Sequence, residues 1–309
     1  MHEHHGSNCP HSNNKVNLKN KNITFAVMIL TGLFMIVEFI GGFVSNSLAL
    51  ISDAGHMLTD FAALFLAWYA FHLSLKPTDI KRTFGYHRFQ VLASFINGLS
   101  ILILAVWIIY EAIIRYFNPQ EIMSQEMFII ATIGLFVNII ALKMLAKANP
   151  NSLNIQGAKL HVIGDLLGSV AAIGSAITIY FTGFVQIDAI LSVLIALLLI
   201  KSAWIVTRRS INILLEFTPD EICQNLIKNE LHEQCPEVDN IHHMHIWSLN
   251  SEIILASMHV VVDKNADLDN DVLINKISNI LKTKYHISHI TVQVEYEKCD
   301  TTHDDLELI

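Results

Sequence analysis

The sequence predicts two domains, an all-α membrane domain of six helices followed by a small water-soluble α+β domain. Hydrophobic residues make up 52% of the chain and charged residues only 16%, which is too apolar for an ordinary soluble protein. Charge is also uneven, since residues 1–209 hold 14 Lys and Arg against 10 Asp and Glu, whereas residues 210–309 hold 6 against 18. We therefore expect most of the chain before residue 210 to lie in a lipid bilayer.

Six stretches are long enough to cross the hydrocarbon core as helices, which takes roughly 20 apolar residues each. They cover residues 23–44, 48–75, 89–117, 127–148, 160–183 and 187–206. Lys and Arg gather before span one, after spans two, four and six, and hardly elsewhere. By the positive-inside rule both termini face the cytoplasm, and we expect a multi-pass protein of the cell membrane. The domains are then a His-rich cytoplasmic tail (1–21), the transmembrane domain (22–209) and a cytosolic domain (210–309).

The C-terminal hundred residues show alternating rather than continuous apolar patterns. A helix is predicted over 219–234, with Thr218 as its N-cap and Pro219 at its first position. Strands over 242–249 and 253–262, joined by a turn at Asn250 and Ser251, precede a helix over 269–285 and a strand over 289–297. The order α-β-β-α-β fits a three-stranded sheet with helices packed on one face.

Several classes are disfavoured by composition. The soluble part is net negative, so nucleic acid is not an expected partner. The four cysteines form no CxxC pair and no disulfide-scaffold spacing, which favours a reducing compartment for the polar regions. The N-terminus has no apolar run typical of a cleavable signal peptide.

Ionisable side chains inside the spans need a reason, because each costs at least about 2.5–3.5 kcal/mol in hydrocarbon. His56 and Asp60 in the second span, like His161 and Asp165 in the fifth, are four residues apart and share a helix face. Two such faces meeting would offer two imidazoles and two carboxylates, the ligands of a tetrahedral zinc site. The plain alternative is inter-helix hydrogen bonding, which the repeated pattern makes a weaker explanation. Asp53 either orients an imidazole or packs helices.

Several segments resemble the cation diffusion facilitator family of zinc transporters. They are SNSLALISDAGHMLTD (45–60), RTFGYHRFQ (82–90), HVIGD (161–165), and HHMHIWSLN followed by ASMHVVVD in the cytosolic domain. The resemblance covers nearly the whole chain. It implies a homodimer of six-span protomers with ferredoxin-like (αββαβ) cytosolic domains, which exports divalent metal from the cytoplasm in exchange for protons and is not an enzyme. Its partners are then the lipid bilayer, metal ions and protons.

By position, the resemblance assigns the transport site to His56, Asp60, His161 and Asp165, in the form that the zinc-selective branch has. Imidazole suits zinc, whereas sites richer in oxygen suit manganese or magnesium; cadmium and cobalt stay alternative ions. Histidine binds zinc only when neutral, so loading the site releases protons. This chemistry favours secondary active transport by alternating access.

The loop after span two offers a second, weaker candidate. His87 matches a loop histidine that some zinc-transporting members use as a ligand, and the alternative is a polar side chain near lipid headgroups. Asp79 matches a loop aspartate of other members, but Arg82 and Tyr86 stand where those members have histidines.

A third candidate lies in the cytosolic domain, where His242, His259 and Glu295 match a regulatory metal site, so that zinc is both substrate and a regulatory or structural ion. Gln293 stands where some members have a further histidine. The candidates for missing ligands are Cys9, His11 and Cys299. Surface or strand-packing roles are expected for His243, His245, His286 and His289. The His-rich tail either binds metal loosely or is a disordered terminus.

The sequence disfavours two functions other than transport. An intramembrane metallohydrolase typically has two histidines and a glutamate at HExxH spacing, and this motif is absent from the chain. A membrane-bound metal sensor needs the spans only as an anchor, for which six spans with mid-helix ligands are excessive.

Overall fold

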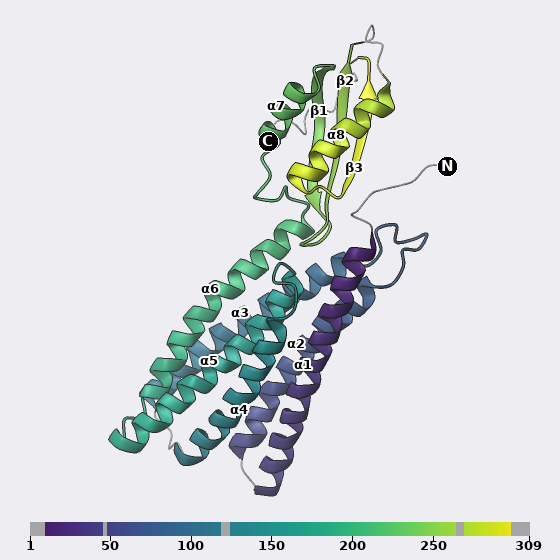
Figure 1. Cartoon of the computed structure of the whole chain (residues 1–309). Coiled ribbons are helices and arrows are strands. Elements are labelled where there is room, and N and C mark those ends of the chain that lie inside the picture. Colours follow the sequence, from purple (N-terminus) through teal and green to yellow (C-terminus); the bar gives the residue numbers. More distant parts are fainter. Residues whose placement is uncertain (1–9, 46–47, 119–123, 264–268, 298–309) are drawn as a thin grey trace. The chain divides into compact units, whose positions relative to one another are not determined.

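The computed structural model describes residues 10–45, 48–118, 124–263 and 269–297. Within the helices, the side chains of residues 10–14, 38, 41–45, 48–56, 59 and 124–127 are also outside the described set. The chain divides into two compact units, Met1–Ile211 and Asn212–Ile309 (Figure 1).

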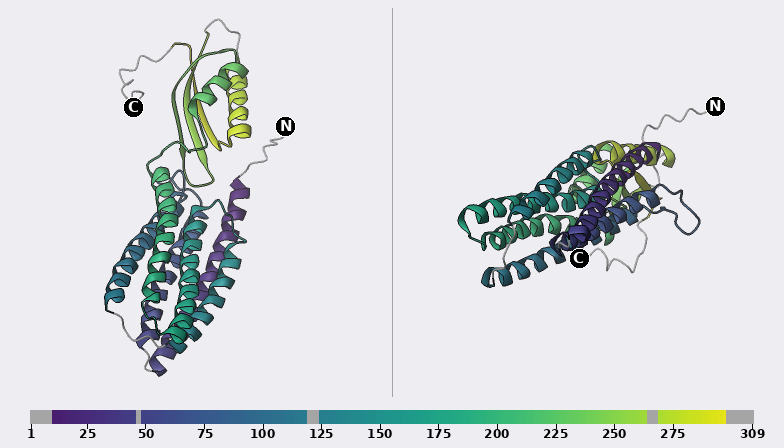
Figure 2. Two further views of the ribbon diagram at one scale, coloured as in Figure 1. Left: turned by 90° about the vertical axis from the view of Figure 1, so that its left-hand side faces the viewer. Right: turned by 90° about the horizontal axis from the view of Figure 1, so that it is seen from below.

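Six long helices form the first unit and run side by side in Figures 1 and 2. They are α1 (Pro10–Ser45), α2 (Leu48–Ser74), α3 (Arg88–Phe117), α4 (Ser124–Leu145), α5 (Leu153–Thr182) and α6 (Ile187–Leu214). Among the described residues, segments of α1, α3, α4, α5 and α6 are long and apolar enough to cross a membrane. α2 is 27 residues long, but the side chains of its first nine residues are not described. The prediction of a six-helix membrane domain is confirmed.

Two helices begin earlier than their apolar stretches do. α1 starts at Pro10 rather than near residue 22, and α5 starts at Leu153 rather than at 160. Polar side chains in these extensions are buried and make hydrogen bonds to other parts of the bundle. The Asn20 Oδ1 atom accepts from the Asn149 amide at 3.0 Å, and the Asn154 Nδ2 atom donates to the Ala67 carbonyl at 2.8 Å. Hydropathy alone does not register such pairing.

α5 lies between two apolar clusters of the bundle. On one side, buried residues of α1, α2, α4 and α5 form a shared core that includes Phe71 and Val162. On the other side, Leu160 of α5 packs with α3 and with α6. α5 ends at Thr182, and the next residue, Gly183, has a φ of 68°, the left-handed conformation that glycine adopts readily after a helix C-terminus.

The second unit has the predicted α-β-β-α-β order. Its elements are α7 (Gln224–Gln234), β1 (Val238–Ser248), β2 (Ile254–Val262), α8 (Asn270–Tyr285) and β3 (His289–Glu295). The sheet order is β1-β2-β3, with β1 antiparallel and β3 parallel to β2. The Asn250 side chain closes the β1–β2 turn by accepting from the Glu252 and Ile253 amides.

One helix boundary was predicted wrongly in this unit. α7 begins at Gln224 with Cys223 as its N-cap residue, not at Pro219. Pro219 instead opens a separate turn, in which its carbonyl accepts from the Ile222 amide at 2.9 Å. Thr218 caps no helix, and its hydroxyl accepts from the Gln224 side chain.

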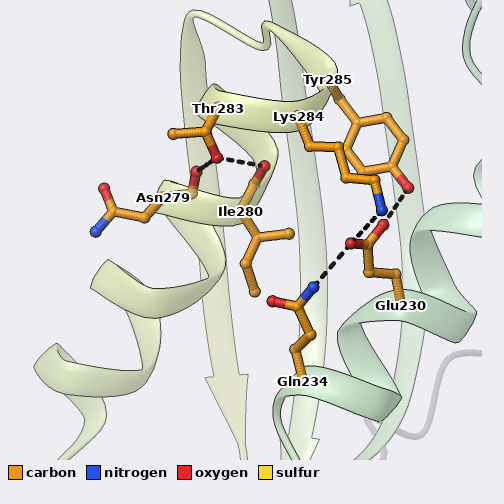
Figure 3. A network of polar contacts seen from close by, with 7 residues as sticks. All are labelled: Glu230, Gln234, Asn279, Ile280, Thr283, Lys284 and Tyr285. Atoms are coloured by element: carbon orange, nitrogen blue, oxygen red, sulfur yellow. Dashed lines mark hydrogen bonds and ion pairs between the residues drawn. The ribbon is translucent and has the colours of Figure 1, made fainter.

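Both helices of the second unit cover the same face of the sheet (Figure 2, left). Their apolar residues, such as Leu231 and Ile277, pack against Ile241, Met258 and other inward-facing strand residues. A polar network joins the two helices at their edge. Glu230 of α7 pairs with Lys284 and accepts from the Tyr285 hydroxyl of α8 (Figure 3).

Candidate metal centres

The seam between α2 and α5 holds an imidazole and a carboxylate in the interior of the bundle. The Nδ1 atom of His161 lies 3.4 Å from the Oδ1 atom of Asp60, and these side chains are 7% and 12% exposed. The other ring nitrogen of His161, Nε2, is buried and has no hydrogen-bond partner among the described residues. A buried imidazole with an unpaired nitrogen beside a carboxylate is the chemistry of a metal ligand pair.

The register of α2 against α5 extends beyond this pair. Asn154 of α5 contacts Ala67 of α2, and His161 of α5 contacts Asp60 of α2. A step of seven residues forward along α5 therefore corresponds to a step of seven residues backward along α2. Seven residues are about two helical turns, and the two helices therefore pack antiparallel in a continuous register. One further turn places position 56 level with position 165.

The four residues of the predicted transport site are thus described unequally. Asp60 and His161 are brought together, and Asp165 is partly buried one turn further along α5. The side chains of His56 and Asp53 lie outside the described set. Beside the seam, Asn97 of α3 is buried and donates to the Ala63 carbonyl of α2 at 3.4 Å, which adds a polar side chain near the site.

The loop between α2 and α3 is organised by an ion pair. The Asp79 carboxylate accepts from the Lys81 amide, the Arg82 amide and the Arg82 guanidinium at 2.7–2.9 Å. Desolvation raises the pKa of Asp79, but the hydrogen bonds from Arg82 and Lys81 outweigh it and leave that pKa lowered. The guanidinium also lies 4.7 Å from the centre of the Tyr86 ring. Asp79 is therefore engaged by arginine.

His87 stands apart from that ion pair, at the N-terminal boundary of α3. Its Nδ1 atom is buried without a hydrogen-bond partner among the described residues, and burial lowers the pKa of its imidazole. The neutral form is the one that binds metals. Among the described residues, the one group of three or more possible metal ligands does not include His87, so its metal role stays a prediction.

The cytosolic domain brings its three predicted ligands together. The Nδ1 atom of His259 lies 2.8 Å from the Oε1 atom of Glu295, and the Nε2 atom of His242 lies 3.3 Å from the Oε2 atom. These ligand atoms all lie within 4.8 Å of one another, the one such group of three or more His, Cys, Asp or Glu residues in the described part of the chain. Gln293 donates to Glu295 at 2.8 Å and so orients the carboxylate.

His243 was expected to be a surface or packing residue, but its ring lies beside this cluster. Its ring centroid is 5.0 Å from that of His242 and 5.1 Å from that of His259. A signal for this was present in the sequence, because apolar Ile241 and Met244 are three residues apart, which breaks the alternation of a regular strand. Cys9 and Cys299 are outside the described residues, as is the side chain of His11.

A bundle of membrane-spanning helices with an imidazole–carboxylate pair in its interior is an integral membrane protein with a functional site at membrane depth. The transmembrane domain of the cation efflux family matches residues 24–215. The cytoplasmic domain of cation efflux proteins matches residues 219–297. The chain belongs to the cation efflux family.

Curated relatives match over nearly their full length. The zinc transporter ZitB of Yersinia pestis is 44% identical over 92% of this chain and 90% of its own length. ZitB of Escherichia coli K12 is 40% identical over 96% of this chain and 93% of its own. A cadmium, cobalt and zinc/H⁺-K⁺ antiporter of Bacillus subtilis is 42% identical, with 90% of each chain covered.

Proposed function

We propose that this chain is a secondary active transporter that exports zinc from the cytoplasm in exchange for protons. The observation that carries the proposal is the buried contact between His161 and Asp60 in the α2–α5 seam. Relatives named as zinc transporters and as a metal/proton antiporter support it. Cadmium and cobalt, which the name of the Bacillus relative includes, are the alternative ions for this chain.

Zinc binds in the seam to Asp60 and His161, with Asp165 and His56 completing a two-imidazole, two-carboxylate set. The antiparallel register supports the set, since position 56 falls level with position 165. Two nitrogen and two oxygen donors suit the tetrahedral preference of zinc.

Exchange for protons follows from the ligands themselves. Imidazole holds either a proton or a metal on the same nitrogen, so protonation weakens zinc binding and zinc binding releases protons. When the seam opens alternately to each side, protons entering from outside displace zinc outward, and zinc arriving from the cytoplasm displaces the protons inward. The proton gradient then sets the direction of transport.

The membrane placement and assembly belong to the same proposal. The protein lies in the cell membrane, with both termini and the second unit on the cytoplasmic side. Two protomers associate through their cytosolic domains. The family match of residues 219–297 to a cytoplasmic domain supports this arrangement. The cluster of His242, His259 and Glu295 holds a further zinc ion with a regulatory or structural role.

The test is zinc uptake into proteoliposomes that contain the purified chain. We expect zinc to accumulate when the lumen is more acidic than the bath, because protons leaving the lumen drive zinc in. Uptake should collapse when a protonophore removes the gradient, and an entrapped pH indicator should report lumenal alkalinisation as zinc enters. Equal accumulation with no pH gradient, accompanied by no proton movement, would refute the exchange.

A further inference from the structure

A β-bulge in β1 changes which residues face the core. His242 pairs with His259, and the next paired position is His245 with Ser257, so two residues of β1 lie opposite one residue of β2. His243 is one of the two, and its φ of 47° is a left-handed conformation that non-glycine residues rarely adopt. Such a conformation persists only where the surroundings impose it.

The bulge puts two adjacent histidines on the same face of the sheet. Ile241, Met244 and Ile246 belong to the apolar core under the helices. In an unbroken strand, residues 241 and 244 would face opposite sides, because side chains alternate. The extra residue lets both face the core, and His242 and His243 are then both turned to the face away from α7 and α8.

The face of the sheet away from α7 and α8 also carries the other members of the cluster. On β2 the core residues are Ala256, Met258, Val260 and Val262, and on β3 the residues packed against the core are Ile290, Val292 and Val294. By alternation, His259 and Glu295 therefore face away from the helices. The short contacts from Glu295 to His242 and His259 agree with this placement.

The three imidazoles form a nearly equilateral triangle. Their ring centroids are separated by 5.0, 5.2 and 5.1 Å for the pairs His242–His243, His242–His259 and His243–His259. Zn–N bonds of about 2.0–2.1 Å put a ring centroid about 3.2 Å from the ion, and tetrahedral angles then separate two centroids by about 5.2 Å. The spacing of the rings is compatible with three histidines around one zinc ion, and it also falls in the ordinary range for packed aromatic rings.

We propose that His243 is a further ligand of the cytosolic cluster, which therefore offers three imidazoles and one carboxylate from a single protomer to one zinc-type cation. The inference rests on the proposed cytosolic zinc site and deepens it. The ligand atoms of His242, His259 and Glu295 already converge. His243 is not part of that converged group in the structure, so its ligation needs a rotation of the imidazole about its χ2 torsion, which leaves the ring centroid close to its place.

The donor set selects the class of ion. Three nitrogens and one oxygen suit zinc, cobalt and other imidazole-binding transition metals, whereas magnesium, calcium and manganese prefer oxygen donors. Four protein ligands also close the coordination shell of zinc, which is typical of structural rather than catalytic sites. A missing ligand from the N-terminal tail or from Cys299 is then not required.

The test uses the full-length chain in detergent with Asp60→Asn as background, so that zinc binding in the membrane domain is weakened. His243→Gly is compared with His245→Ala, a matched histidine two residues further along β1 that is exposed. We expect His243→Gly to lower zinc affinity by about tenfold or more and to weaken the visible absorption of bound Co²⁺, which is strongest in four-coordinate sites. His245→Ala should leave both unchanged.

Thermal stability separates a ligand role for His243 from a purely structural one, because loss of a structural residue would lower the melting temperature even without zinc. Glycine relieves the left-handed strain at this position, so with chelator present the variant should melt at or above the temperature of the background protein. It should nevertheless lose much of the zinc-induced rise in Tm. If the Gly variant binds zinc and cobalt as His245→Ala does, the assignment of His243 is overturned.

His259→Ala separates this failure from failure of the site itself. If it removes one bound zinc per protomer while His243→Gly removes none and changes no affinity, only the ligand role of His243 is wrong. If His259→Ala also leaves zinc stoichiometry and the cobalt spectrum unchanged, the proposed cytosolic site is wrong and the inference falls with it.

Discussion

The two units use the same pair of chemical groups in different settings. In the membrane domain, His161 and Asp60 meet inside a helix seam and are 7% and 12% exposed. In the cytosolic domain, His242, His259 and Glu295 meet on the sheet face that the helices leave uncovered, where the His259 side chain is 27% exposed. A site between packed helices changes when the helices move, whereas a site on one sheet is held by fixed strand register. The first is suited to moving an ion and the second to keeping one.

The largest effect is expected at the seam. Asp60→Asn keeps the shape of the side chain but removes the charge that faces His161. Loss of this proposed metal ligand should reduce zinc uptake into proteoliposomes by at least about 100-fold, since loss of outer-shell partners alone typically costs 10–100-fold. Asp188→Asn, which changes a carboxylate in the first turn of α6, is the matched control and should transport normally. Retained uptake in Asp60→Asn would remove the assignment.

The shared helix face of His161 and Asp165 follows more directly from the sequence than the cluster on the sheet does. A spacing of four residues is enough to place His161 and Asp165 on one helix face, because helix geometry is local. The spacing does not say which helices pack against each other. That Asp60 lies opposite His161 depends on the packing of α2 against α5. The family resemblance supplied that pairing.

In the sheet, register and bulges are properties of two strands at once. His259 and Glu295 are 36 positions apart in sequence, and their meeting needs the parallel β2–β3 pairing in the observed register. The bulge that turns His243 to the same face was not anticipated. The start of α7 was missed for a related reason, since Pro219 is compatible with both a first helical turn and an isolated turn.

An intermediate effect is expected for the cytosolic cluster. His259→Ala should remove one zinc ion per protomer, measured by metal analysis of the purified chain, because it removes a proposed ligand next to Glu295. Its effect on transport should be smaller than that of Asp60→Asn, on the order of fivefold, as is typical of coupling between separate sites. Transport by His245→Ala should match the unchanged protein. Complete loss of transport in His259→Ala would show that the cytosolic site is itself required for transport and does not serve only to hold an ion.

The smallest effect is expected at the helix side of the cytosolic domain, where Glu230 joins α7 to α8 (Figure 3). Hydrogen bonds from Lys284 and Tyr285 lower the pKa of Glu230. Burial and the bond to Glu230 raise the pKa of Tyr285 to about 12. The lowered pKa of Glu230 stabilises the fold at pH values above the pKa of this residue in the unfolded chain. This stabilisation is lost as the pH falls through the folded-state pKa. The raised pKa of Tyr285 stabilises the fold below about pH 10, the ordinary pKa of tyrosine. This stabilisation is lost as the pH rises toward 12.

Glu230→Gln should therefore increase hydrogen exchange of the α7 and α8 amides a few-fold at neutral pH, measured by mass spectrometry on the intact chain. The difference from the unchanged protein should shrink in acid, where Glu230 is itself protonated. Glu233→Gln changes an exposed carboxylate of the same helix and should have no such effect. Zinc stoichiometry should stay unchanged in both variants, because the cluster of His242, His259 and Glu295 lies on the opposite face of the sheet. A loss of zinc in Glu230→Gln would mean that helix docking controls the strand register, and the cytosolic site would then be as mobile as the seam.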